Sequence, residues 1–299
     1  MLRLQSITDA LLGPRADAWV GRATVWTALV GFLVHLSLWA LLASGVWSFG
    51  RETVLLQSPL LALYTPFSIL LAYEVFQLIR VIPESFSASI GKQFEVITLI
   101  VARESLVYLA GLSAADFEAI GPWILPLLVK GAAFVTLLTV SLAIGLEGAR
   151  RSPATTTSPG TRRYVAIKQG MSVGLLGVFL VMAIFSVGSW TADAVRGDGT
   201  VSSSIFFSDF FTILVLVDIF ILLMSYQYTH RFSVLARNTG FVLSTVIMRI
   251  ALDAPIYADA ILFMIAAVVG FLVLWITNRL DPGPDDGGGQ FEQSSGQAG

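Results

Sequence analysis

The chain has 299 residues, of which 56% are apolar and only 13% are charged. Soluble domains carry about 25% charged residues, so this composition cannot cover a surface that faces water. The chain has no cysteine, which excludes disulfides, iron–sulfur clusters, thiolate metal sites and cysteine nucleophiles. The formal net charge of −2 gives no indication of a nucleic acid partner.

Long apolar runs predict eight membrane-spanning helices. A helix of about 20 apolar residues crosses a hydrocarbon core about 30 Å thick. In chain order, the runs cover approximately residues 24–47, 58–82, 92–112, 121–146, 169–190, 206–229, 238–253 and 257–279. We therefore expect an all-α, polytopic transmembrane protein that is embedded in a lipid bilayer.

Three polar segments flank or separate these runs. Residues 1–23 form an N-terminal segment, in which 2–12 have the pattern of a short interfacial helix. Residues 147–168 contain the sequence SPATTTSPGT and predict a linker. Residues 281–299 are rich in Gly, Ser, Gln and acidic residues, which is typical of a disordered tail.

The distribution of basic residues predicts the orientation in the membrane. If the N-terminus is cytoplasmic, thirteen of the 18 Lys and Arg residues fall in cytoplasmic segments, and only Arg51 and Arg196 fall in outer loops. Positive residues gather in the cytoplasmic loops of membrane proteins. We therefore expect a multi-pass protein of the cell (inner or plasma) membrane, with both termini and the linker in the cytoplasm.

The two halves of the chain have similar patterns. Residues 24–146 and 169–280 can be aligned helix to helix, either because the unit was duplicated or because unrelated helices align by chance. The aligned residues include Phe86 with Phe232, Arg103 with Arg249 and, after a two-residue offset, Glu74 with Asp218. Each unit has an even number of spans, so two copies have the same orientation. The alignment predicts two parallel four-helix repeats.

Four charged residues lie near the middle of the predicted spans. Glu74 and Asp218 lie on the second helix of each unit, and Arg103 and Arg249 lie on the third. A charge at this depth costs about 2.5–3.5 kcal/mol and is normally paired or faces a polar cavity. We predict two buried ion pairs, Glu74–Arg103 and Asp218–Arg249. Such pairs either fix the helix register only or line a site for a small anion.

Three further residues extend this polar set. Asp253 lies one turn after Arg249 and can hold its guanidinium. Glu95 lies two turns before Arg103 on the same face and can extend a polar stripe. Lys130 has no equivalent in the second unit, and we interpret it as a side chain that snorkels toward the membrane surface.

The chain shows no motif of a cofactor site or an enzyme. The two histidines, His35 and His230, lie on different predicted helices, so they form no pair at helical spacing for haem or zinc. There is no Gly-rich phosphate loop and no intramembrane aspartate pair or Ser/His set. We expect no cofactor, no metal and no enzymatic activity.

The second half carries a set of motifs that resembles a known family. The motifs are an acidic residue inside an apolar span at Asp218, the Arg231-Phe232 junction, Arg249-Ile-Ala-Leu-Asp253 and the closing Leu-Trp-Ile-Thr-Asn-Arg279. With them, residues 206–280 resemble the phosphate-starvation-inducible PsiE family of small four-helix membrane proteins. The chain differs in being a tandem fusion, in having Asp at 218 where the family has Glu, and in lacking a Pro before Asn238.

The sequence is compatible with three functions. The resemblance implies a PsiE-like membrane protein of unassigned activity that is linked to phosphate limitation or stress. The embedded arginines indicate a transporter or channel for a small anion. The third possibility is a scaffold that binds other membrane proteins or further copies of the chain as a homo-oligomer.

Overall fold

The computed structural model describes residues 2–45, 58–112, 120–196, 203–228, 232–255 and 257–280. The predicted tail at 281–299 and part of the predicted linker, 151–158, lie outside these residues. The described residues form helices α1 (Leu2–Leu12), α2 (Pro14–Ala43), the 3₁₀ helix η2 (Pro59–Leu63), α3 (Tyr64–Val81), α4 (Phe86–Ala110), α5 (Ile120–Arg150), α6 (Pro159–Arg196), α7 (Ser203–Tyr228), α8 (Phe232–Leu252) and α9 (Ala258–Leu280).

The chain is a multi-pass membrane protein by the length and composition of its helices. Within the described residues, seven helices are long and apolar enough to cross a membrane. The eighth long helix, α4, has 25 residues but carries four charged residues, Lys92, Glu95, Arg103 and Glu104. These charges lie inside a helix that packs against α3, α5 and α8. The partners of the charged side chains therefore help to determine how α4 packs in the bundle.

Several helices begin earlier than the apolar pattern predicts. The helix predicted from residue 24 begins at Pro14, the one predicted from 92 begins at Phe86, and the one predicted from 238 begins at Phe232. The residues added at the start of α2 include a polar side chain that finds partners on a neighbouring helix. Asp17 of α2 accepts hydrogen bonds from Gln77 (2.7 Å) and Tyr73 (3.0 Å) of α3.

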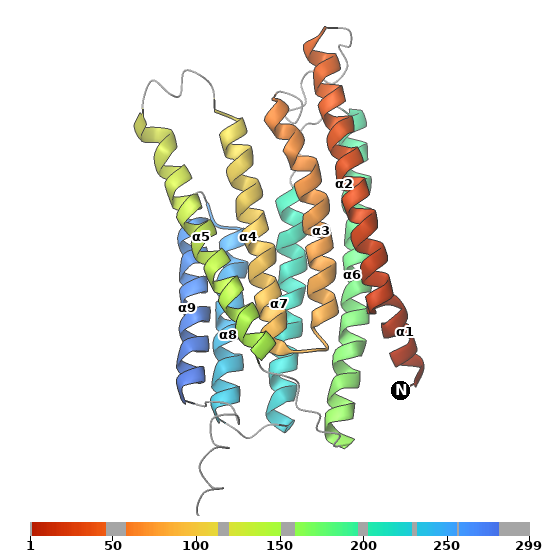
Figure 1. Ribbon diagram of the computed structural model, residues 1–299, viewed down its shortest axis with the longest axis vertical. Coiled ribbons are helices and arrows are strands. Elements are labelled where there is room, and N and C mark those ends of the chain that lie inside the picture. The colour runs from red at the N-terminus through yellow and green to blue at the C-terminus, as the bar shows by residue number, and fades with distance from the viewer. Residues whose placement is uncertain are drawn as a thin grey trace, which may run out of the picture.

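The helices alternate in direction and pack in the same order within each half. In Figure 1, α1 and the end of α9 both lie at the lower end of the molecule. In the first half α2 packs on α3, α3 on α4 and α4 on α5, and in the second half α6 packs on α7, α7 on α8 and α8 on α9. The halves join through contacts of α4 with α8 and of α5 with α9.

The ring of Phe94 on α4 lies close to α9 of the second half. Phe94 of α4 is fully buried, and a Cβ atom at Gly270 of α9 would lie 2.9 Å from its ring. The absence of a side chain at Gly270 therefore leaves room for the Phe94 ring against α9. This contact belongs to one apolar core that contains residues from both halves, including Leu71, Ile97, Phe210, Phe241 and Phe263.

Candidate functional site

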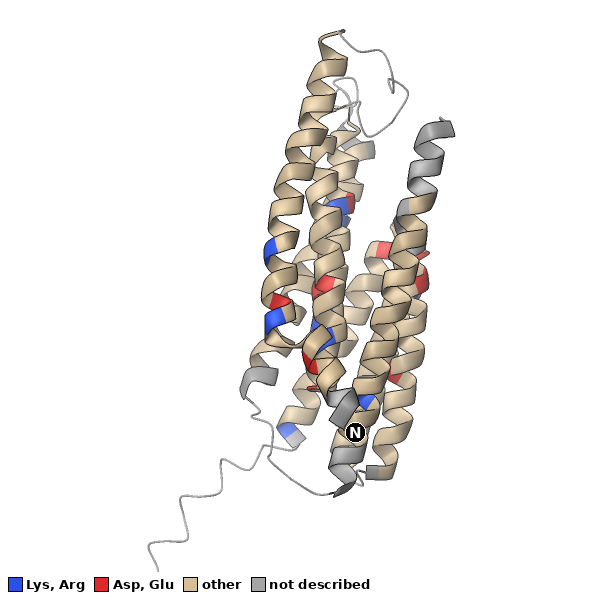
Figure 2. Ribbon diagram, turned by 90° about the vertical axis from the view of Figure 1, so that its right-hand side faces the viewer, with Lys and Arg blue, Asp and Glu red and all other residues tan. Residues whose placement is uncertain are grey.

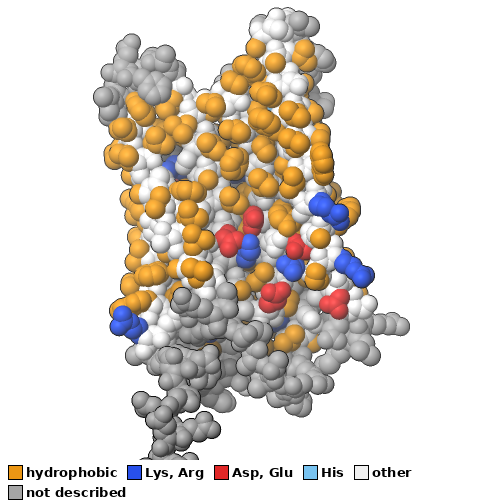
Figure 3. All heavy atoms as spheres, viewed as in Figure 1, with side chains coloured by type: hydrophobic (Ala, Val, Ile, Leu, Met, Phe, Trp, Pro, Cys, Tyr) orange, Lys and Arg blue, Asp and Glu red, His pale blue; other side chains and the backbone are white. Residues whose placement is uncertain are grey.

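Charged side chains lie along the middle of the helices as well as at their ends. Figure 2 shows basic and acidic residues at several heights of the bundle, and Figure 3 shows them gathered on an otherwise largely apolar face. In a membrane such residues are normally paired or face a polar cavity. The partner of each charged side chain therefore indicates whether its role is only structural.

Arg103 is buried, and none of the described acidic residues pairs with it. Its side chain is only 5% exposed, and its Nη1 atom is buried without a hydrogen-bond partner. The guanidinium lies between two aromatic faces, with Cζ 5.0 Å from the ring centre of Tyr64 and 5.5 Å from that of Phe207. Aromatic faces attract a cation, but they do not accept the strong hydrogen bonds that a guanidinium donates.

The predicted pair Glu74–Arg103 is wrong, because the two residues lie at different heights. Glu74 instead accepts a hydrogen bond from Lys92 at 3.2 Å. It lies seven residues before the end of α3, and Lys92 lies six residues after the start of α4, which places both about 9–10 Å from that end of the bundle. Arg103 lies 17 residues after the start, at about 26 Å.

Lys92 binds a second carboxylate on its own helix. Glu95, one turn further along α4, forms an ion pair with Lys92. Glu95 thus lies in a cluster with Lys92 and Glu74 that links α3 to α4. This cluster has no excess positive charge for an anion.

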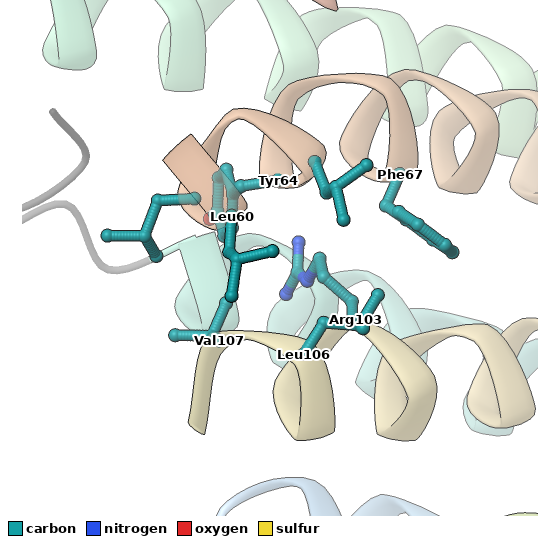
Figure 4. A pocket seen from close by; sticks show the side chains of 8 residues that line it. Leu60, Tyr64, Phe67, Arg103, Leu106 and Val107 are labelled. Atoms are coloured by element: carbon teal, nitrogen blue, oxygen red, sulfur yellow. The ribbon is translucent and has the colours of Figure 1, made fainter. Parts of the chain in front are cut away.

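A small pocket opens at the Arg103 guanidinium. It is lined by apolar side chains of η2, α3 and α4 together with Tyr64, namely Leu60, Leu61, Leu63, Phe67, Leu106 and Val107. Figure 4 shows Arg103 reaching from α4 toward the side chains of η2 and α3. The pocket encloses about 10 Å³, which is room for about one water molecule.

The second predicted pair, Asp218–Arg249, is also wrong. Asp218 of α7 is fully buried, and its Oδ2 atom accepts a hydrogen bond from Gln93 Nε2 of α4 at 2.6 Å. Asp218 lies ten residues before the end of α7, about 15 Å from that end, whereas Arg249 lies 17 residues, or about 26 Å, after the start of α8. A charge-based search of the sequence misses Gln93 because that side chain is neutral.

Asp253 holds the Arg249 guanidinium, as their spacing of one helical turn indicates. Nη1 of Arg249 donates to Asp253 Oδ2 at 2.5 Å, and its Nε atom donates to the hydroxyl of Thr212 on α7. The other oxygen of Asp253 accepts a hydrogen bond from Ser208 at 2.6 Å. Arg249 and Asp253 therefore link α7 to α8, and the charge of Arg249 is neutralised.

We expect acid to weaken this link between α7 and α8. The hydrogen bond from Ser208 and the Arg249 guanidinium lower the pKa of Asp253, which follows the end of the α8 span. The link is therefore complete above the ordinary aspartate pKa of about 4 and is lost as the pH falls through the lowered value. Melting temperatures in detergent between pH 6 and pH 2 should fall less in Asp253→Asn than in the wild type. An equal fall in both proteins contradicts this assignment.

Lys130 is the centre of a network of three helices rather than a snorkelling side chain. Its Nζ atom on α5 lies 2.8 Å from Glu104 of α4 and 2.9 Å from Asp259 of α9. The Lys130 side chain is only 10% exposed. Sequence reasoning did not connect Lys130 with Glu104 or Asp259. The only signal was that all three are charged residues inside predicted spans.

Among the described residues, no group of three or more His, Asp or Glu side chains is placed to hold a metal ion. The charged side chains in the helices are of two kinds, those with a partner of opposite charge and those without one. Lys92, Lys130 and Arg249 each have carboxylate partners. Arg103 and Asp218 have no partner of opposite charge within the described part of the chain.

Comparison with known proteins gives no match. No known protein family, no curated protein and no solved structure is similar to this chain. The resemblance of residues 206–280 to the PsiE family therefore stays a prediction. Arg103 and Asp218, which have no partner of opposite charge among the described residues, are the side chains that point to a function.

Proposed function

We propose that the protein is a channel or transporter for a small monovalent anion, with Arg103 as the group that binds it. The observation that carries this proposal is the buried guanidinium whose Nη1 atom has no hydrogen-bond partner. Arginine keeps its charge in proteins and has five N–H donors but no acceptor. An uncompensated charge in the membrane is costly, and a bound anion removes this cost.

The surroundings of Arg103 favour a small, weakly hydrated anion. The pocket is lined by leucine, valine and aromatic side chains, which offer little to replace a tightly held hydration shell. Its volume of about 10 Å³ fits about one water molecule, so chloride, which is larger than water, requires the pocket to widen. Phosphate requires the pocket to open much further. We therefore name chloride as the first substrate to test.

The proposal includes eight spans in two parallel repeats, in the cell membrane, with both termini in the cytoplasm. The same packing order of the helices in each half supports the repeats. The presence of α1 and the end of α9 at one end of the molecule supports an even number of spans (Figure 1). Under this topology, Arg103 lies in the outer half of α4.

A PsiE-like role in phosphate limitation is the second candidate and predicts a different anion. It rests on the motifs around Asp218, Arg231, Arg249 and Arg279. If that role involves transport, phosphate should cross the membrane instead of chloride. The flux experiment therefore measures both anions.

The test is anion flux into liposomes that contain the purified protein. Wild type should carry chloride, and Arg103→Gln should reduce the rate by about tenfold or more, because a hydrogen bond to a charged group contributes about 1.5–3 kcal/mol. The matched control is Arg249→Gln, which removes the same charge from a residue that Asp253 already neutralises. It should retain flux. Absence of chloride and phosphate flux in the wild type sets transport aside and favours a scaffold.

A further inference from the structure

The geometry points to a proton-binding site in the membrane core, in which Asp218 carries an exchangeable proton and shares it with Gln93. Both side chains are fully buried, and the two lie on different helices of different halves. The pair is joined by a hydrogen bond of 2.6 Å from Gln93 Nε2 to Asp218 Oδ2. The proposal rests on the two oxygen atoms that this bond leaves unused.

Both of these oxygen atoms are buried without a hydrogen-bond partner. They are Oδ1 of Asp218 and Oε1 of Gln93. An ionised carboxylate and an amide carbonyl only accept hydrogen bonds, so neither atom can satisfy the other while Asp218 is charged. A proton on Oδ1 makes that atom a donor and gives it an acceptor on the residue it already contacts. One proton therefore completes the hydrogen bonding of both side chains.

Within the described part of the chain, no nearby cation takes the place of this proton. Helix α7 packs against α6 and α8, and its Asp218 is hydrogen-bonded to Gln93 of α4. On α4, Lys92 is paired with two glutamates, and on α6, Lys168 donates to a backbone carbonyl. On α8, Arg237 lies near the start of the helix, and Arg249 in the last turn is held by Asp253. Among the described residues, Gln93 is the hydrogen-bonding partner that Asp218 has.

A route for the proton follows α4 toward the end of the bundle at Phe86. Ser89 lies one turn before Gln93 on the same face of α4. Ser89 is only 2% exposed, and among the described residues its hydroxyl has no hydrogen-bond partner. A hydroxyl both donates and accepts, so Ser89 is the next group along α4 that can relay a proton between the Asp218 carboxyl and this end of the helix.

The proton site itself does not depend on the proposed function. A role of this site in anion transport rests on the proposed function. Arg103 and Gln93 both lie on α4, ten residues or about 15 Å apart. If one anion at Arg103 and one proton at Asp218 cross together, no net charge moves. The proton leaves the carboxyl group for water on the far side, and Asp218 must be reloaded before the next cycle.

Infrared spectroscopy of the purified protein tests the proton site. At pH 6 the wild type should show a carbonyl band of a buried carboxylic acid that Asp218→Asn lacks. The asparagine amide supplies the N–H donor in place of the acid O–H, so this variant should keep the melting temperature of the wild type. Gln93→Met should keep the acid band but shift it, because the hydrogen bonds are gone. Absence of an Asp218-dependent band, or a clear loss of stability in Asp218→Asn, overturns the proposal.

Flux measurements then test the coupling. A pH gradient, acid outside, should speed chloride uptake by the wild type severalfold, and this acceleration should be absent in Asp218→Asn. Uptake that the gradient speeds equally in both proteins contradicts the coupling. The two failures can be told apart, because a missing chloride flux leaves the infrared band in place, and a missing band leaves the flux in place.

Discussion

Replacing Lys130 with Met is expected to lower the free energy of unfolding by about 3–5 kcal/mol, because it leaves the buried carboxylate of Asp259 and the half-buried carboxylate of Glu104 without a cation. Glu104 and Asp259 share the Lys130 ammonium group, which joins α4, α5 and α9 at distances of 2.8 and 2.9 Å. Without the ammonium group, two negative charges face each other in a medium of low dielectric constant. The measurement is the unfolding of the purified protein in detergent, followed by its helical circular dichroism.

Two further variants separate the charge from the packing of the side chain. Adding Glu104→Gln and Asp259→Asn to Lys130→Met removes the stranded charges and should recover most of the loss. Lys92→Met is the matched control, since Lys92 also binds two carboxylates but its side chain is 25% exposed. A loss from Lys92→Met as large as that from Lys130→Met contradicts the importance we give to burial.

The sequence pattern predicts the long helices well because it depends only on apolar run length. The pattern is weaker at helix starts, where polar residues are helical as well. The start of α4 lies at Phe86 instead of residue 92, and six residues of helix correspond to about 9 Å. Depths counted from residue 92 therefore place Arg103 about 9 Å too close to Glu74, and this error contributes to the wrong ion pair.

Contacts between distant helices could not be predicted from one sequence. Lys130 and Asp259 are 129 residues apart, and Gln93 and Asp218 are 125 residues apart. Apolar periodicity states which face of a helix is buried, but in a membrane most faces are apolar, so it does not identify the neighbour. The pair Arg249–Asp253 could be predicted because both residues lie on one turn of a single helix.

Arg103→Met should raise the stability of the anion-free protein by about 1–3 kcal/mol, since replacing a buried charge by an apolar side chain of similar volume is often stabilising. The loss of contacts with the rings of Tyr64 and Phe207 offsets part of this gain. Melting temperatures in detergent with gluconate as the only anion measure this effect. A purely structural Arg103 predicts the opposite sign.

Adding chloride then tests why a destabilising residue is present. A ligand that binds only the folded protein stabilises it according to its concentration and affinity, so chloride should raise the melting temperature of the wild type and leave that of Arg103→Met unchanged. Arg249→Met is the control, because its charge is already neutralised by Asp253; it should be less stable than the wild type but should still respond to chloride. If both arginine variants respond equally, the anion binds elsewhere. If only Arg103→Met fails to respond, the unpaired guanidinium is a binding group that reduces the stability of the anion-free protein.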